Sequence, residues 1–145
     1  MRVFVDANVI FDVVLKREPF FQDSNTFLLL CAKRQASLAP HTVTNAFYTL
    51  QKELSEEEGK SMLLEILSFM DVVTIGKPQI IKALKNNAIG DFEDALQLEC
   101  AREFGADCIV TRDPKYFVGS GIKTMSPRDF LEKHGRSFGA KGAKQ

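Results

Sequence analysis

The sequence predicts an α/β fold, a three-layer α/β/α sandwich around a central parallel sheet of four to five strands. Short apolar runs alternate along the chain with longer segments in which apolar residues recur at helical spacing. This alternation is typical of parallel strands joined by helices that cover both faces of a sheet. The chain has 145 residues and a hydrophobic content of 45%, which suits one domain with its own core.

Five apolar runs are expected to form the strands. The run from Val3 to Val5 is β-branched and aromatic, and it is long enough only for a buried strand. Pro40 limits the second run, and the last run is expected at an edge of the sheet. The expected strands lie at residues 3–5, 37–39, 72–75, 108–111 and 122–125.

The first three helices are bounded by proline and by capping residues. Pro19 follows the end of the first helix, because the residue before a proline is pushed out of helical backbone space. Asp23 or Ser24 can cap the second helix, and Thr42 or Thr44 begins the third. These signals predict helices at residues 8–15, 23–34 and 42–54.

The later helices carry clearer signals. The run from Ser55 to Glu58 resembles a capping box, and Pro78 suits a first helical turn. Gly105 ends a helix whose apolar residues cover most of its circumference, so this helix should be largely buried, Phe92 included. The expected helices lie at residues 55–69, 78–86, 91–104 and 126–133, and Phe47 and Tyr48 are expected in the core.

The composition limits the classes of function. The chain has 19 lysines and arginines and 19 aspartates and glutamates, and this zero net charge argues against binding nucleic acid by bulk charge. We expect no membrane association, since no apolar run approaches the roughly 18 residues that span a bilayer.

The three cysteines have no CxxC spacing and no signal peptide is recognisable, so we expect a cytoplasmic protein with buried, inert thiols. We expect one domain at residues 1–134 and a flexible basic tail at residues 135–145.

Four aspartates fall where an open α/β sheet places its ligand site, beyond the carboxyl ends of the strands. Asp6 follows the first strand directly, and Asp113 follows the fourth. Asp91 and Asp94 are three residues apart, so they project from one face of the first turn of their helix. A buried carboxylate needs a partner, and oxygen ligands alone suit Mg²⁺ or Mn²⁺.

Each acid also has a structural explanation. Asp6 and Asp91 could be the N-caps of the helices that they precede, and Asp113 with Pro114 is a common turn opener. Capping is expected to explain Asp94 least well. The four acids together favour a metal site, and no phosphate-binding glycine loop or GxSxG motif offers a competing chemistry.

The chain resembles the PIN domain family, metal-dependent ribonucleases that include the VapC-type toxins. Three ordered motifs over about residues 1–134 carry the resemblance, at residues 3–10, 91–96 and 109–117. It implies that acids bind Mg²⁺ or Mn²⁺ and that RNA is cleaved to 5′-phosphate and 3′-hydroxyl ends. It also implies a homodimer and, for a toxin, a cognate antitoxin protein. By position, Asp6, Asp94 and Asp113 would be catalytic and hold the metal, Asp91 would be an auxiliary acid and Asn8 would orient Asp6.

The second motif departs from the family pattern. Many members have a glutamate in a Thr-x-x-Glu stretch after the second strand, where this chain has Asn45. An amide oxygen can ligate a metal or hold its bound water, but it brings no charge. The chain is similar in this respect to a PIN subgroup with asparagine at this position.

The leading hypothesis is a Mg²⁺- or Mn²⁺-dependent endoribonuclease that acts as the toxin of a type II toxin–antitoxin pair. The substrate contacts are expected at Thr111, Arg112 and Lys115. Further basic side chains near the substrate backbone are expected at Lys16, Arg17 and Lys52. One alternative is a catalytically weak or silent PIN-like module that binds RNA or protein. Another is a Mg²⁺-dependent phosphatase or phospho-receiver that uses Asp6 as its phosphoacceptor, although residues 6–8 lack a DxD pattern.

The Asn45→Glu variant tests the alignment of the second motif. At an effective dielectric constant near 20, two unit charges ~4 Å apart interact by roughly 4 kcal/mol. If a quarter of this remains after desolvation, Mn²⁺ affinity rises about fivefold. The same acid should lower the melting temperature of the metal-free protein, because it adds repulsion. Calorimetry with Mn²⁺ and thermal unfolding measure both effects, and a variant unchanged in both would place Asn45 outside the site.

Overall fold

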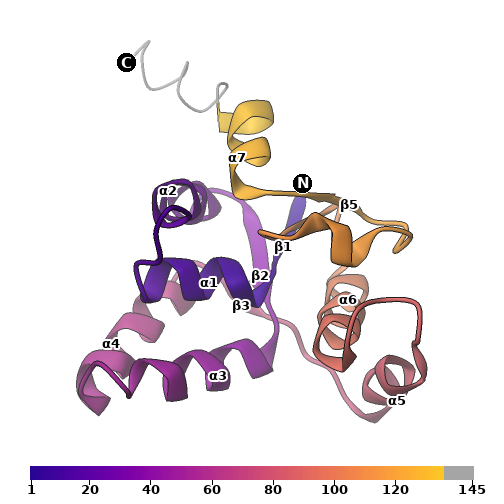
Figure 1. The fold of residues 1–145 in the computed structure, drawn as a ribbon, viewed down its shortest axis with the longest axis horizontal. Helices are drawn as coiled ribbons and strands as arrows, with labels where there is room; N and C mark the ends of the chain where they lie inside the picture. The colour runs from indigo at the N-terminus through magenta and orange to yellow at the C-terminus, as the bar shows by residue number, and fades with distance from the viewer. Residues whose placement is uncertain (136–145) are drawn as a thin grey trace.

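The computed structural model describes residues 1–135 and contains the expected parallel sheet (Figure 1). Its five strands stand in the order β3-β2-β1-β4-β5, and every neighbouring pair is parallel. The strands are β1 (Arg2–Val5), β2 (Gln35–Leu38), β3 (Asp71–Val72), β4 (Cys108–Val110) and β5 (Lys123–Met125). The chain thus builds outward from β1 to β3 and then returns to place β4 on the other side of β1.

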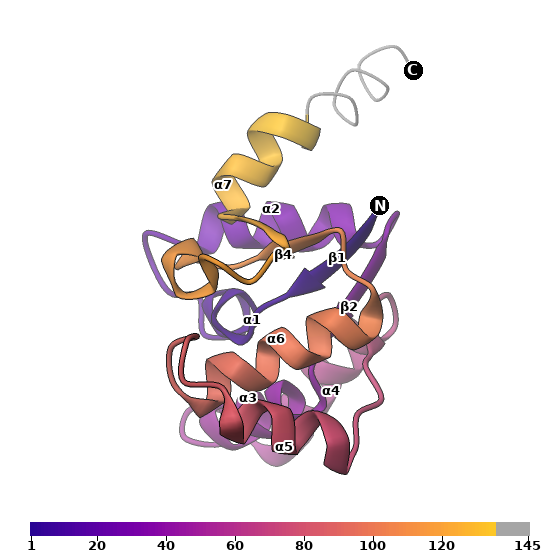
Figure 2. The same cartoon turned by 90° about the vertical axis from the view of Figure 1, so that its right-hand side faces the viewer.

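Helices cover both faces of the sheet, which confirms the three-layer prediction. In Figure 1, α1 and α2 lie on one side of the sheet and α6 lies on the other; Figure 2 shows α6 between the sheet and α5. The helices are α1 (Ala7–Val14), α2 (Phe21–Cys31), α3 (Pro40–Leu50), α4 (Glu56–Leu67), α5 (Lys77–Lys85), α6 (Phe92–Phe104) and α7 (Pro127–Phe130), with a 3₁₀ turn η1 (Pro114–Phe117) and a π-helical turn η2 (Leu131–Gly135).

Each central strand contributes side chains to two apolar clusters. Val3 and Val5 pack with α1, α2, α3 and α4, whereas Phe4 between them packs with α6. In β4, Cys108 and Val110 join the first cluster and Ile109 joins the second. Because successive side chains of a strand point to opposite faces, short apolar strands can be buried on both sides.

Several element bounds differ from those expected. The third strand was expected at residues 72–75, but only Asp71–Val72 pairs with β2, which ends at Leu38. The third helix begins at Pro40 rather than at a threonine, since the first helical turn tolerates a proline that has no N–H to donate. The last α-helix ends at Phe130, where the backbone widens into η2. The tail prediction concerns residues 136–145 for the most part, which lie outside the described residues.

The local signals at helix ends are mostly confirmed. Ser55 caps α4 in a capping box with Glu58, and Gly105 ends α6 in the left-handed conformation at φ 71°. Two core predictions are wrong: Tyr48 and Phe92 are 63% and 46% exposed, because Tyr48 lines open grooves beside α3 and Phe92 is the first residue of α6.

The cysteines follow the expectations within the described residues. Cys31, Cys100 and Cys108 are buried and free, and burial raises the pKa of the first two thiols to about 12. Such thiols stay protonated at neutral pH and are poor nucleophiles. In residues 1–135, no helix combines the length and apolar character needed to cross a membrane.

Gly59 in α4 offers a test of this packing. A Cβ added there meets Phe47 at 3.7 Å, an ordinary contact, and the helical backbone accepts alanine. We expect Gly59→Ala to raise the free energy of unfolding by about 0.5–1 kcal/mol, measured by urea denaturation. Gly105→Ala is the matched comparison and should lower it, because alanine is strained at φ 71°. A destabilised Gly59→Ala variant would contradict the packing of α4 on α3.

Candidate metal centre

Two of the four predicted aspartates, Asp6 and Asp94, line one pocket near the carboxyl ends of β1 and β4. The strand order reverses between these two parallel strands, because β2 and β3 lie on one side of β1 and β4 and β5 on the other, and such switch points form crevices in α/β folds. The pocket has a volume of about 470 Å³. Among its lining residues are Asp6, Asn8, Asn45, Tyr48, Glu93 and Asp94.

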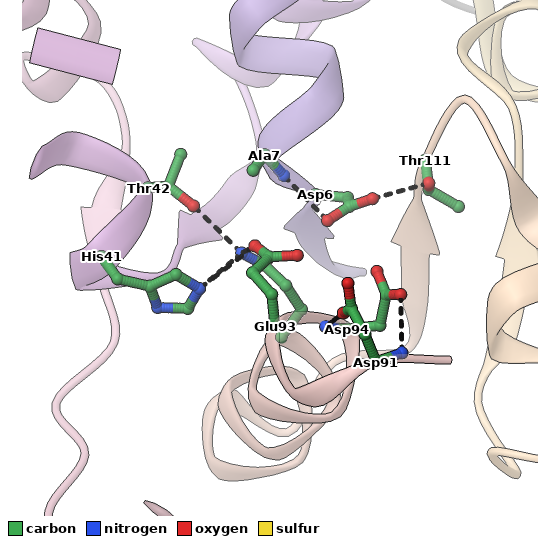
Figure 3. A network of polar contacts seen from close by, with 9 residues as sticks. Asp6, Ala7, His41, Thr42, Asp91, Glu93, Asp94 and Thr111 are labelled. Carbon is green, nitrogen blue, oxygen red and sulfur yellow. Dashed lines mark hydrogen bonds and ion pairs between the residues drawn. The ribbon is translucent and has the colours of Figure 1, made fainter. Parts of the chain in front are cut away.

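Asp6 is held at the base of this pocket between two strand ends (Figure 3). Its Oδ1 accepts a hydrogen bond from the N–H of Ala7 at 2.9 Å, as the N-cap of α1, and its Oδ2 accepts one from the Thr111 hydroxyl at 2.8 Å. The side chain is almost completely buried. Burial raises the pKa of Asp6 to about 7, and the charges of Glu93 and Asp94 add to this effect.

Asp91 and Asp94 form a capping box at the start of α6. The Asp94 N–H donates to Asp91 Oδ1 at 2.9 Å, and the Asp91 N–H donates to Asp94 Oδ2 at 3.2 Å. The expectation that capping explains Asp94 poorly is therefore wrong, since Asp94 is the N3 partner of the box. Partial burial still raises the pKa of Asp94 to about 6, with the charges of Asp91 and Glu93 contributing.

Glu93 belongs to this cluster and was missed by the sequence analysis. Carboxylate oxygens of Asp91, Glu93 and Asp94 lie within 4.8 Å of one another, close enough to share a cation. The Glu93 side chain also receives a hydrogen bond from Gln97, four residues along α6. The i, i+4 spacing of Glu93 and Gln97 on one helix is the signal that could have identified Glu93.

The two predicted asparagines take different positions. Asn8 donates from Nδ2 to Thr111 Oγ1 at 3.3 Å and accepts at Oδ1 from the N–H of Arg112 at 3.1 Å, so any effect on Asp6 passes through Thr111. Asn45 lines the pocket from α3, and its side chain forms no hydrogen bond within residues 1–135.

The residues that follow β4 lie at the periphery. Asp113 does not line the pocket; its carboxylate is 3.9 Å from Arg112 Nε and about one-third exposed. The Arg112 guanidinium instead bonds buried Asp12 at 2.9 Å and stacks over Phe20, 4.4 Å from the ring centre. Thr111 is fully buried, and its hydroxyl donates a hydrogen bond to Asp6.

Lys115 lies near the pocket entrance. Its ammonium is 5.5 Å from the ring centre of Tyr116, and Tyr116 lines the pocket. Of the basic residues predicted to contact the substrate, Lys115 is therefore the one whose contacts lie at the rim of the pocket.

The donor set fits a hard divalent cation. Its members are carboxylates, with an amide nearby, and no cysteine or histidine nitrogen lines the pocket. Within residues 1–135 no lysine or arginine forms an ion pair with Asp6, Glu93 or Asp94. Burial and, to a smaller extent, repulsion raise the pKa values of Asp6 and Asp94, and a bound cation would offset both effects.

Comparisons with known proteins agree on one fold. A family model for the PIN domain matches residues 2–115. The chain is similar in structure to VapBC2 of Rickettsia felis bound to a promoter DNA fragment, at 17% identity and a TM-score of 0.64, covering 87% of this chain and 98% of that one. VapBC-1 of nontypeable Haemophilus influenzae matches at 14% identity and a TM-score of 0.65, covering 88% and 99%.

A third similar structure is VapC20 of Mycobacterium tuberculosis, a toxin that cleaves the sarcin–ricin loop. It matches at 12% identity and a TM-score of 0.61, covering 83% of this chain and 95% of that one. At such identities the likeness establishes a shared fold. No curated protein matches the sequence.

The raised pKa of Asp6 predicts how stability depends on pH in the metal-free protein. An unfolded aspartate has a pKa of about 3.9, so between pH 4 and 7 the folded protein binds more protons and loses stability as pH rises. We expect Asp6→Asn, which can keep the cap, to increase the free energy of unfolding by roughly 2–4 kcal/mol at pH 8 and by much less at pH 5. Urea denaturation at both values, with exposed Glu53→Gln as the control, measures this. Equal effects of Asp6→Asn at both pH values would refute it.

Proposed function

The chain belongs to the PIN domain family, and from this premise we propose that it is a Mg²⁺- or Mn²⁺-dependent endoribonuclease. The observation that carries the proposal is the meeting of Asp6, Glu93 and Asp94 in one pocket at the β1/β4 switch point. The pKa values of Asp6 and Asp94 are raised, and within residues 1–135 no lysine or arginine pairs with any of the three acids. This arrangement supports a cation site rather than a set of surface acids.

In this proposal Asp6 and Asp94 hold the metal, with Asp91 as an auxiliary acid and Asp113 at the outer edge. A bound divalent cation lowers the pKa of water and stabilises charge on a phosphodiester. Thr111 fixes the orientation of Asp6, and the capping box fixes the relative positions of Asp91 and Asp94. These contacts keep the carboxylates in place before any cation binds.

The rim of the pocket suits single-stranded RNA. Tyr48 and Tyr116 both line the pocket, and their side chains are 63% and 44% exposed. Exposed aromatic rings can stack on unpaired bases, and Lys115 can contact the phosphate backbone. Arg112 and Thr111 are proposed to act on the structure of the site, because their polar groups are occupied by Asp12 and Asp6.

We propose that the protein is the toxin of a toxin–antitoxin pair and forms a homodimer. The similar structures include VapBC complexes bound to DNA, in which a toxin and its antitoxin occur together. An apolar groove of about 460 Å³ between α3 and α4 offers a protein-binding surface next to the acidic pocket, because Tyr48 lines both.

A silent PIN-like module that binds RNA or protein is the second candidate, and the uncharged Asn45 in the pocket favours it. The phospho-receiver alternative loses support. Both carboxylate oxygens of Asp6 accept hydrogen bonds and the side chain is buried, whereas a phosphoacceptor must reach its donor.

Cleavage of structured RNAs, including a sarcin–ricin stem–loop, tests the activity with Mn²⁺ or with EDTA. We expect EDTA to stop cleavage and Asp94→Asn to reduce kcat/KM by at least about 100-fold, because loss of a metal ligand should exceed the effect of its supporting residues. Glu58→Gln is the matched control, since Glu58 is the N3 acid of the α4 capping box and lies away from the pocket. Cleavage that resists EDTA, or equal rates for Asp94→Asn and wild type, would reject the enzyme hypothesis.

A further inference from the structure

Position 45 brings no charge to the pocket, but Glu93 does. Asn45 reaches the pocket from α3, and Glu93 reaches it from α6. Figure 3 shows the Glu93 carboxylate on the side of α6 that faces Asp6, and both side chains line the pocket. Glu93 lines the same pocket as Asp6 and Asp94, and one of its carboxylate oxygens lies within 4.8 Å of ligand oxygens of Asp91 and Asp94.

A partly buried polar network holds the Glu93 carboxylate. Gln97 Nε2 donates to Glu93 Oε1 at 2.9 Å and to Thr42 Oγ1 at 3.1 Å. His41 Nε2 lies 3.3 Å from the same Glu93 oxygen. The network joins α3 to α6, so the position of Glu93 depends on two helices.

Gln97 is an unusual residue at its place in the fold. Its side chain is fully buried in the middle of α6, and its Oε1 has no hydrogen-bond partner within residues 1–135. A buried amide with an unpaired oxygen costs stability. The hydrogen bond from Gln97 to Glu93 explains why this cost is tolerated, because it fixes one oxygen of the Glu93 carboxylate. In this position Glu93 has an oxygen within 4.8 Å of ligand oxygens of Asp91 and Asp94.

We propose that Glu93 is a metal ligand that supplies the negative charge absent at position 45, and that Gln97, supported by Thr42 and His41, is its positioning residue. This inference rests on the proposed function, because it assigns a ligand to the same cation site. It predicts that charge at 93 and charge at 45 are interchangeable: an acid at either position can serve the cation, since both line one pocket.

Calorimetric titration of the metal-free protein with MnCl₂ tests the ligand role. We expect Glu93→Gln to weaken Mn²⁺ binding by about tenfold or more, because a unit charge a few ångströms from the cation is removed while the hydrogen bond from Gln97 is kept. Glu103→Gln is the control, since Glu103 is an exposed acid of the same helix outside the pocket, and it should leave the affinity unchanged. Mn²⁺ affinity that is equal in Glu93→Gln and wild type would overturn the inference.

The interchange of charge has its own test. Asn45→Glu introduced into Glu93→Gln should restore Mn²⁺ affinity to within about threefold of wild type, because the charge returns to the same pocket. Affinity that stays as low as in Glu93→Gln alone would overturn the claim that Glu93 replaces the acid at 45. Thermal unfolding of each variant checks that the differences come from folded protein.

The positioning role of Gln97 is separable from a general effect on stability. We expect Gln97→Met to weaken Mn²⁺ binding by about 10-fold, within the range for residues that orient metal ligands. Combined with Glu93→Gln it should weaken binding no further than Glu93→Gln alone, because Gln97 acts through Glu93. Additive losses in the double variant would overturn the positioning role.

Asp94→Asn distinguishes failure of this inference from failure of the proposed function. If Asp94→Asn weakens Mn²⁺ binding and Glu93→Gln does not, the metal site stands and the role of Glu93 is rejected. If the wild-type protein binds no Mn²⁺, or Asp94→Asn binds it as wild type does, both proposals are rejected.

Discussion

The buried carboxylate of Asp6 is the constraint on which the rest of the site depends. It ends β1, caps α1 and accepts a hydrogen bond from Thr111 at the end of β4, so it ties three elements together. Burial removes most of its hydration and raises its pKa to about 7, and the nearby charges of Glu93 and Asp94 add to this effect. A buried carboxylate of this kind is stabilised by taking up a proton or by binding a cation. Cation binding is the chemistry that we propose for this site.

The fold tolerates this repulsion because the acids also have structural roles. Asp91 and Asp94 satisfy backbone N–H groups at the start of α6, and a helix N-terminus favours negative charge. Capping and metal binding are therefore compatible functions of the same side chains. Burial of the apolar clusters on both faces of the sheet stabilises the fold and offsets the repulsion among the acids of the pocket.

The basic residues near the site divide into two groups. Arg112 is committed to buried Asp12 and to the face of Phe20, which anchors the segment after β4 against α1. Breaking a buried ion pair leaves an uncompensated charge, so this arginine is poorly placed to leave for a substrate. The ammonium of Lys115 lies over the ring of Tyr116 and forms no ion pair within the described residues, so it is available to contact a substrate.

Much of the architecture could be predicted from local sequence. Short β-branched runs, prolines and capping residues gave the alternation of strands and helices, because each depends on neighbours a few positions away. The same local logic placed Asp6 at a strand end and put Asp91 and Asp94 on one face of a helix, as the structure has them. The resemblance to the PIN domain and the match of the family model over residues 2–115 agree for the same reason, since both rest on ordered local motifs.

Only the tertiary structure decided how these pieces meet. The strand order places the end of β4 beside Asp6, whereas Tyr48, expected in the core, lies exposed at the pocket rim. Glu93 joins the acids through Gln97 and Thr42, which are 55 residues apart along the chain. The sequence determined the strands, the helix ends and the acids available, because these follow from local backbone preferences. Which side chains share the pocket depends on contacts between distant segments, and local spacing does not encode those contacts.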